Sequence, residues 1–69
     1  MKITAAQRRM LAHAARYPID GLPEWFLTGR ARQIVQRLES RRLMTSAYHG
    51  NSRHYHITNE GRALLKGGA

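Results

Sequence analysis

One stretch, residues 29–43 (GRARQIVQRLESRRL), constrains the chain most, because its apolar residues fit the periodicity of a helix. Four of them fall at i, i+3, i+4 and i+7, which is the spacing of one helical face. They are Ala31, Ile34, Val35 and Leu38. The other face carries Arg30, Arg32, Gln33, Gln36 and Arg37. The sequence therefore predicts a helix over about 30–41, fixed to a core by one face and exposing Arg and Gln on the other.

The charge balance points to a polyanionic partner. Twelve Lys and Arg residues stand against 4 Asp and Glu, giving a formal net charge of +8, and ten of the twelve are Arg. A solvated surface usually mixes Lys with Glu, so this excess of Arg favours a nucleic acid. A membrane surface would require one continuous basic amphipathic helix, whereas these basic residues are spread over several elements. We expect no membrane partner.

Length and cysteine content limit the class of protein. A chain of 69 residues is expected to form one domain over 1–69, ordered over about 4–66, with 67–69 as a frayed tail. The absence of Cys excludes a disulfide framework and a thiolate metal site. No segment approaches the roughly 20 apolar residues of a membrane span, and no signal peptide is evident. We expect a cytoplasmic, nucleoid-associated protein from a prokaryote or a mobile element.

The first half of the chain predicts helices around a turn. Residues 4–16 form the first helix, which Thr4 and Gln7 begin with a capping-box pattern and which Pro18 ends. A connector follows, with a short strand near 21–22 and with Ile19 and Leu22 turned inward. A short second helix over 23–27 and a tight turn at 28–29 lead into the helix described above, which is the arrangement of a helix-turn-helix.

The second half predicts a hairpin and a last helix. Two strands over 43–47 and 53–57 flank a turn at 49–52. Thr58 is typical of an N-cap, and the last helix runs on to residue 66. The expected core includes the bulkiest apolar residues, namely Leu11, Trp25, Phe26, Tyr55 and Ile57; a partly exposed Trp25 would instead be a docking residue for a partner.

Two motifs resemble the winged helix-turn-helix family, in the style of MarR-like and related small regulators. QRLESRRL (36–43) resembles the "RLxxRGL" end of that family's recognition helix, and YHITNEGRALL (55–65) resembles its "YxLTxxGxxLL" return from the wing. The resemblance covers about 4–66. It implies a mainly α fold with a small β-hairpin: three helices, a wing hairpin and a short C-terminal helix.

The chain departs from the family pattern in two ways. Arg42 stands where the family has Gly at the end of the recognition helix. A left-handed conformation there costs a residue other than Gly about 1 kcal/mol or more, so either the cap is strained or the helix ends differently. The long helices that dimerise MarR-type repressors are absent.

The resemblance implies sequence-preferring binding of double-stranded DNA, in a transcriptional regulator. Its recognition helix would read base edges in the major groove through Arg30, Arg32, Gln33, Gln36 and Arg37. Phosphate and wing contacts are expected from Thr28, Asn51, Ser52, Arg53, Arg8 and Arg9. A single module reads few base pairs, so a homodimer or a larger protein complex is a further expected partner.

Two other functions stay open: a protein-interaction adaptor, docking through Trp25 or the His-bearing strand, and an RNA binder. Catalysis is not expected, because the four acidic residues are scattered and no nucleophile–base pair or phosphate loop is present. The small core also argues against a small-molecule ligand.

Histidines concentrate in the hairpin. His54 and His56 share a strand face and His49 lies across the turn, and three imidazoles are enough ligands for a zinc site with an open position. No Cys or neighbouring carboxylate joins them, and we expect a solvated face with no metal and no cofactor. Protonation of these imidazoles below about pH 6.5 would add positive charge beside DNA.

Overall fold

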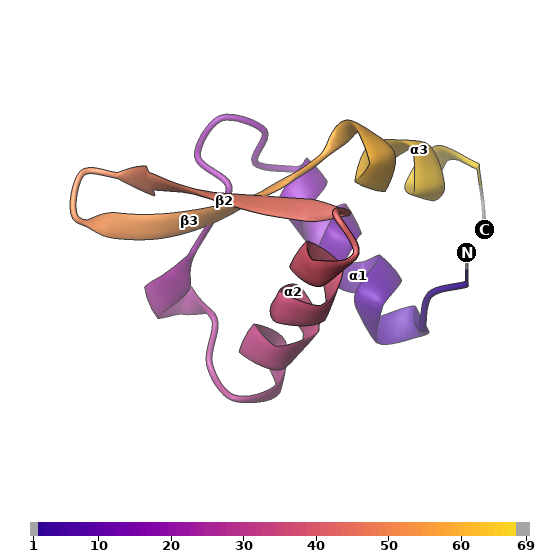
Figure 1. Cartoon of the computed structure of the whole chain (residues 1–69), viewed down its shortest axis with the longest axis horizontal. Coiled ribbons are helices and arrows are strands. Elements are labelled where there is room, and N and C mark those ends of the chain that lie inside the picture. The colour runs from indigo at the N-terminus through magenta and orange to yellow at the C-terminus, as the bar shows by residue number, and fades with distance from the viewer. Residues whose placement is uncertain (1, 68–69) are drawn as a thin grey trace.

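The computed structural model describes residues 2–67, which form three α-helices and a three-stranded antiparallel sheet (Figure 1). The elements are α1 (Ala5–Ala15), β1 (Leu22–Pro23), the 3₁₀ turn η1 (Glu24–Phe26), α2 (Arg30–Ser40), β2 (Met44–His49), β3 (Ser52–Ile57) and α3 (Asn59–Lys66). Their order follows the expected one, and about half of the chain is helical. None of the helices in this part of the chain is long and apolar enough to cross a membrane. The expected frayed tail falls largely on residues 68–69, outside the described residues.

The sheet has the strand order β1-β3-β2. Strands β2 and β3 pair antiparallel from Met44↔Ile57 to His49↔Ser52, so the hairpin closes through Gly50 and Asn51. Both strands are slightly longer than the sequence predicts, and the hairpin projects past the helices, pointing away from α3 (Figure 1). The predicted short strand is present as β1, which pairs with β3.

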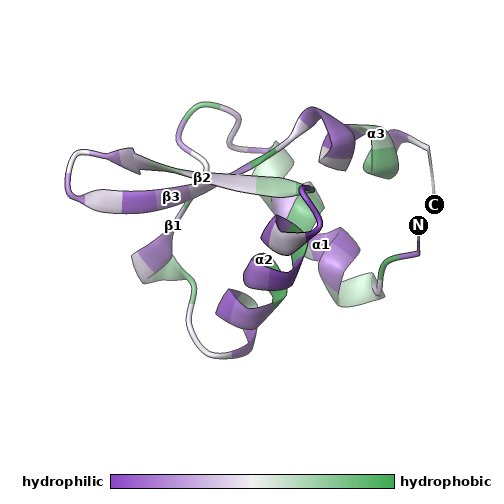
Figure 2. Ribbon diagram, in the orientation of Figure 1, coloured by the Kyte–Doolittle hydropathy of each residue, from purple (hydrophilic) through white to green (hydrophobic). Residues whose placement is uncertain are grey.

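One hydrophobic cluster joins the helices α1 and α2 to the sheet, and apolar segments of the ribbon turn toward it in Figure 2. Its buried members are Leu11, Ala14, Leu22, Leu27, Val35, Leu38, Leu43, Met44, Tyr55 and Ile57. The predicted burial of Leu11, Tyr55 and Ile57 is confirmed, as is that of Leu22.

The predicted burial of Trp25 and Phe26 is wrong. Trp25 is 73% exposed and Phe26 is 54% exposed, because residues 24–26 form a single 3₁₀ turn instead of a longer helix. That turn closes with the Leu27 N–H donating to the Glu24 carbonyl over 3.0 Å. A turn of three residues cannot direct consecutive bulky side chains to one face, and Leu27 fills the core position in their place.

The inward position expected of Ile19 is also wrong, since its side chain is 81% exposed. Ile19 lies in the loop where the Gly21 N–H donates to the Tyr17 carbonyl over 2.8 Å. Gly21 has a φ of +68°, and a Cβ there would lie 2.5 Å from the Tyr55 carbonyl oxygen. Glycine therefore lets this loop pass directly against β3, and Ile19 is left in the outer part of the loop.

Side-chain caps start the first and last helices as the sequence predicts. Thr4 Oγ1 accepts from the Gln7 N–H and Gln7 Oε1 accepts from the Thr4 N–H, each over 3.0 Å, which completes the capping box of α1. Thr58 Oγ1 accepts from the Gly61 N–H at the start of α3 and donates to the Arg42 carbonyl over 2.8 Å. Thr58 therefore ties α3 to the turn that follows α2.

Helix α2 ends in a left-handed residue. The sequence left open a strained cap at Arg42 or a different end of the helix, and the structure has the strained cap. Arg42 has a φ of +63°. The Leu43 N–H donates to the Leu38 carbonyl and the Arg42 N–H to the Glu39 carbonyl, both over 2.9 Å. This is the hydrogen-bond pattern of a Schellman motif, and the burial of Leu38 and Leu43 supplies the apolar contact that accompanies it.

We predict that Arg42→Gly raises the free energy of unfolding by up to about 1 kcal/mol, because glycine adopts a positive φ without the steric cost of a Cβ. Arg41→Gly is the matched control, because it removes the same charge at a residue whose φ is −93°. It should lower the free energy of unfolding. Urea denaturation of both variants measures the difference, and equal destabilisation would show that the cap carries no strain.

Candidate nucleic-acid interface

Helix α2 is anchored by the face that the sequence assigns to the core. Val35 and Leu38 are completely buried, and Ala31 and Ile34 are partly buried against the same cluster. Their spacing fixes the rotation of the helix about its own axis. The opposite face of α2 is therefore held in one orientation toward solvent.

The five residues expected to read base edges are all exposed, and Arg30 among them lies at the edge of α2 that borders α1: Arg30, Arg32, Gln33, Gln36 and Arg37. Figure 2 shows the strongly hydrophilic turns of α2. The only acidic residue of the helix, Glu39, is half-buried, and its Oε2 accepts a hydrogen bond of 3.0 Å from Ser46 Oγ on β2. The exposed face thus offers guanidinium and amide groups with no competing carboxylate, which suits both phosphates and base edges.

The start of α2 has donors that no side chain caps. Gly29 takes the N-cap position with a φ of +52° and gives no side-chain hydrogen bond. Thr28, an expected phosphate contact, is exposed, and its carbonyl accepts from the Ala31 N–H over 3.1 Å. The positive end of the helix dipole therefore lies beside Arg30, in an arrangement that favours an anion.

The hairpin residues expected at the wing differ in how far their side chains are exposed to solvent. Asn51 is exposed and Ser52 is half-buried. Arg53 lies on the same face of β3 as the buried Tyr55, with its guanidinium carbon 5.8 Å from the Tyr55 ring centroid. Its Nε is buried and has no hydrogen-bond partner. Arg53 is thus partly held against the hairpin instead of extending freely from it.

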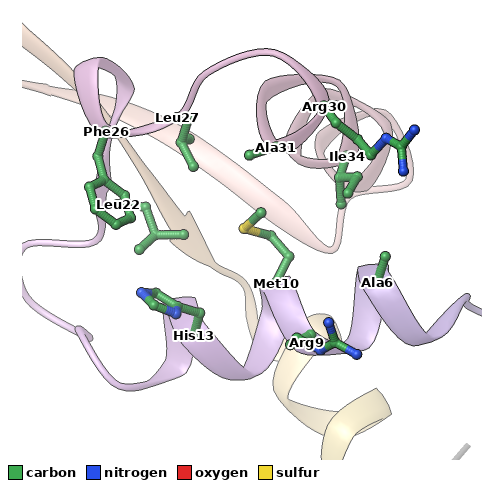
Figure 3. Close-up of a pocket in the computed structure, with 10 residues that line it drawn as sticks. All are labelled: Ala6, Arg9, Met10, His13, Leu22, Phe26, Leu27, Arg30, Ala31 and Ile34. Carbon is green, nitrogen blue, oxygen red and sulfur yellow. The ribbon is translucent and has the colours of Figure 1, made fainter.

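The two arginines expected to reach phosphates from α1 separate. Arg8 is half-buried, whereas Arg9 is exposed and lines a cleft between α1 and α2. Figure 3 shows Arg9 on α1 and Arg30 on α2 toward the same end of this cleft, with Met10 and Ile34 pointing into it from the two helices. The cleft has a volume of about 420 Å³, and none of its lining residues is acidic. Arg9, and not Arg8, therefore extends the basic surface of α2 onto α1.

Exposed aromatic side chains lie at this cleft, whereas the sequence favoured their burial and left only the exposure of Trp25 open. Trp25 and Phe26 meet edge to face with ring centroids 6.3 Å apart, and Phe26 stacks on His13 at 6.1 Å. Phe26 and His13 both line the cleft. A three-residue 3₁₀ turn gives no periodic signal in the sequence, so pattern alone could not have shown that these rings face outward.

The hairpin brings its three histidines together on one face of the sheet. Their order along the strands fixes this shared face, but the distances depend on the twist and on the rotamers. The His49 ring lies 4.5 Å from that of His54 and 5.1 Å from that of His56, centroid to centroid. His49 Nε2 and His56 Nε2 are 3.0 Å apart, and His54 Nδ1 lies 2.7 Å from the Asp20 carbonyl oxygen.

The cluster disfavours protonation of its inner member. Burial lowers the pKa of His56 below 6.5, and the neighbouring His49 and His54 lower it further, while Asp20 acts weakly in the opposite direction. His56 is therefore mainly neutral in neutral solution. In the 3.0 Å hydrogen bond between His49 Nε2 and His56 Nε2, one nitrogen donates and the other accepts.

Comparisons with family models, with curated proteins and with solved structures find no match to this chain.

We predict that the protein loses stability on acidification through His56. The folded pKa of His56 lies below its unfolded value, so the unfolded state binds the proton more readily. This contribution is fully present above about pH 6.5 and is lost as the pH falls through the folded pKa. The midpoint of thermal unfolding should fall between about pH 7.5 and pH 5, and less so in His56→Gln.

His13→Gln is the matched control, because His13 lies on α1 outside the hairpin cluster. It should keep the pH dependence of the wild type. A His56→Gln variant with the full wild-type dependence would contradict the assignment.

Proposed function

We propose that the protein is a winged-helix DNA-binding protein that recognises double-stranded DNA and acts as a regulator of transcription. In this function α2 enters the major groove and the β2–β3 hairpin acts as the wing. The observation that carries the proposal is the exposed, acid-free Arg and Gln face of α2, whose orientation is fixed by the buried Val35 and Leu38.

The arrangement of elements supports the winged-helix assignment. A helix, a short strand, a helical turn, a second long helix, a hairpin and a last helix follow one another, and the first strand pairs with the last. The left-handed turn at Arg42 agrees with the family pattern, in which Gly stands at this position. The departure is η1, one 3₁₀ turn in the place of the second helix.

Affinity and sequence preference would come from different groups. The uncapped start of α2, Thr28, Arg9 and the hairpin residues Asn51 and Ser52 would contact phosphates, which position a protein on DNA without reading sequence. Arg32 and Gln33, exposed in the first turn of α2, would read base edges. A second copy of the chain or a larger complex would supply the additional contacts that a long target needs.

A second candidate function, a protein-interaction adaptor, is favoured by one observation. Trp25 and Phe26 expose large aromatic surfaces beside an apolar cleft, and Trp and Tyr are enriched at the centres of protein interfaces. As an adaptor, the protein would not bind duplex DNA selectively, and substitutions of Arg32 or Gln33 would leave its function unchanged.

We predict that the protein binds a duplex selected from a random-sequence pool with an affinity that falls steeply with salt. Fluorescence anisotropy over a range of salt concentrations measures this dependence. Arg32→Ala should cost about 1–3 kcal/mol of binding free energy and relax the preference for the selected sequence. Gln33→Ala should reduce the preference without changing the salt slope, because the amide carries no charge.

Arg62→Ala is the matched control, since Arg62 is exposed on α3 and its loss changes the net charge equally. It should retain the wild-type preference. Absence of saturable binding at low salt, or equal effects of Arg32→Ala and Arg62→Ala, would overturn the proposal and favour the adaptor. Tighter binding to RNA of the same sequence would favour an RNA binder instead.

A further inference from the structure

The outer face of the hairpin places two imidazole nitrogens at the separation of two ligands on one metal ion. His49 Nε2 and His56 Nε2 are 3.0 Å apart. Two nitrogens bonded at about 2.0 Å to one ion lie about 2.8 Å apart at a right angle and about 3.3 Å apart at the tetrahedral angle. The observed spacing falls between these values, so an ion could replace the proton that the two rings share.

The surroundings of the pair restrict both rings. The ring of His49 contacts two other imidazoles. The angle between ring planes is 24° for His49 and His56 and 30° for His49 and His54. His54 is itself held by Asp20: a carbonyl oxygen only accepts, so His54 Nδ1 donates the hydrogen bond of 2.7 Å. The hairpin therefore holds its three imidazoles in contact instead of leaving them as freely rotating side chains, which lowers the entropy cost of coordination.

We propose that His49 and His56 form a bidentate site for a divalent late transition-metal ion, coordinated through both Nε2 atoms, with water at the remaining positions. Imidazole suits Cu²⁺, Ni²⁺ and Zn²⁺, and the first two accept nitrogen ligands at right angles. Among residues 2–67 no group of three or more His, Asp or Glu side chains is arranged to hold a metal ion, so the site rests on this pair.

The two ligands of the proposed site come from different strands of the hairpin. His49 is the last residue of β2 and His56 lies in β3. A bound ion therefore links the two strands near the end of the hairpin. This inference does not depend on DNA binding.

Titration calorimetry with Ni²⁺ and with Cu²⁺ at about pH 7.5, above the ordinary pKa of His, tests the site in the full chain. The wild type should bind one ion, and His49→Gln and His56→Gln should each lose at least about tenfold in affinity, since even outer-shell partners are worth about 10–100-fold. Ni²⁺ should raise the thermal midpoint of the wild type but not of either variant.

His13→Gln serves as the control and should bind both ions as the wild type does. Broadening of backbone NMR signals by Cu²⁺ locates the ion: the proposal requires broadening of residues in β2 and β3. Circular dichroism establishes that each variant is folded. Broadening confined to the first residues of the chain, or affinities unchanged in both variants, would overturn the site.

Discussion

The structure depends on how the apolar face of α2 is held. Val35 and Leu38 are completely buried, and removal of a buried Leu side chain costs about 2–5 kcal/mol. Leu38 also accepts the hydrogen bond from Leu43 that closes the turn at Arg42. This turn thus ends the helix and leads into Leu43 and Met44, which are buried in the core at the start of the hairpin. Relief of the strain at Arg42 is accordingly expected to act on the stability of the whole chain.

This anchoring has an electrostatic consequence. Because the apolar side chains of α2 are used in packing, its Arg and Gln residues face solvent, and Ser46 holds the one carboxylate of the helix against β2. A net charge of +8 on 69 residues destabilises a compact state through self-repulsion. A polyanion would relieve this repulsion most effectively where the basic residues gather on one surface. The composition does not show such a surface, whereas the orientation of α2 does, so the structure supports nucleic-acid binding more strongly than the composition.

The sequence predicted what depends on local periodicity and capping, and it failed where tertiary packing decides. The face of α2, the capping box at Thr4 and the N-cap at Thr58 are confirmed, because each arises from residues within one or two turns. The size of Trp25 and Phe26 favours burial, but the 3₁₀ turn that carries them leaves both side chains exposed. At the candidate site, the exposure of the α2 residues was predictable. The separation of the His49 and His56 nitrogens was not, because it depends on how two side chains on different strands lean toward each other.

The cleft between α1 and α2 carries the basic surface from α2 to α1. Its apolar lining includes Met10 and Ile34, and Arg9 and Arg30 lie toward one end of it. Arg30 is the first residue of α2, where the helix dipole is positive. Arg9 and the start of α2 therefore border the same cleft. Arg8, one residue earlier, is half-buried on another side of α1. Contact between α1 and a phosphate is thus expected through Arg9, and the apolar lining beside it would raise the strength of that contact by excluding water.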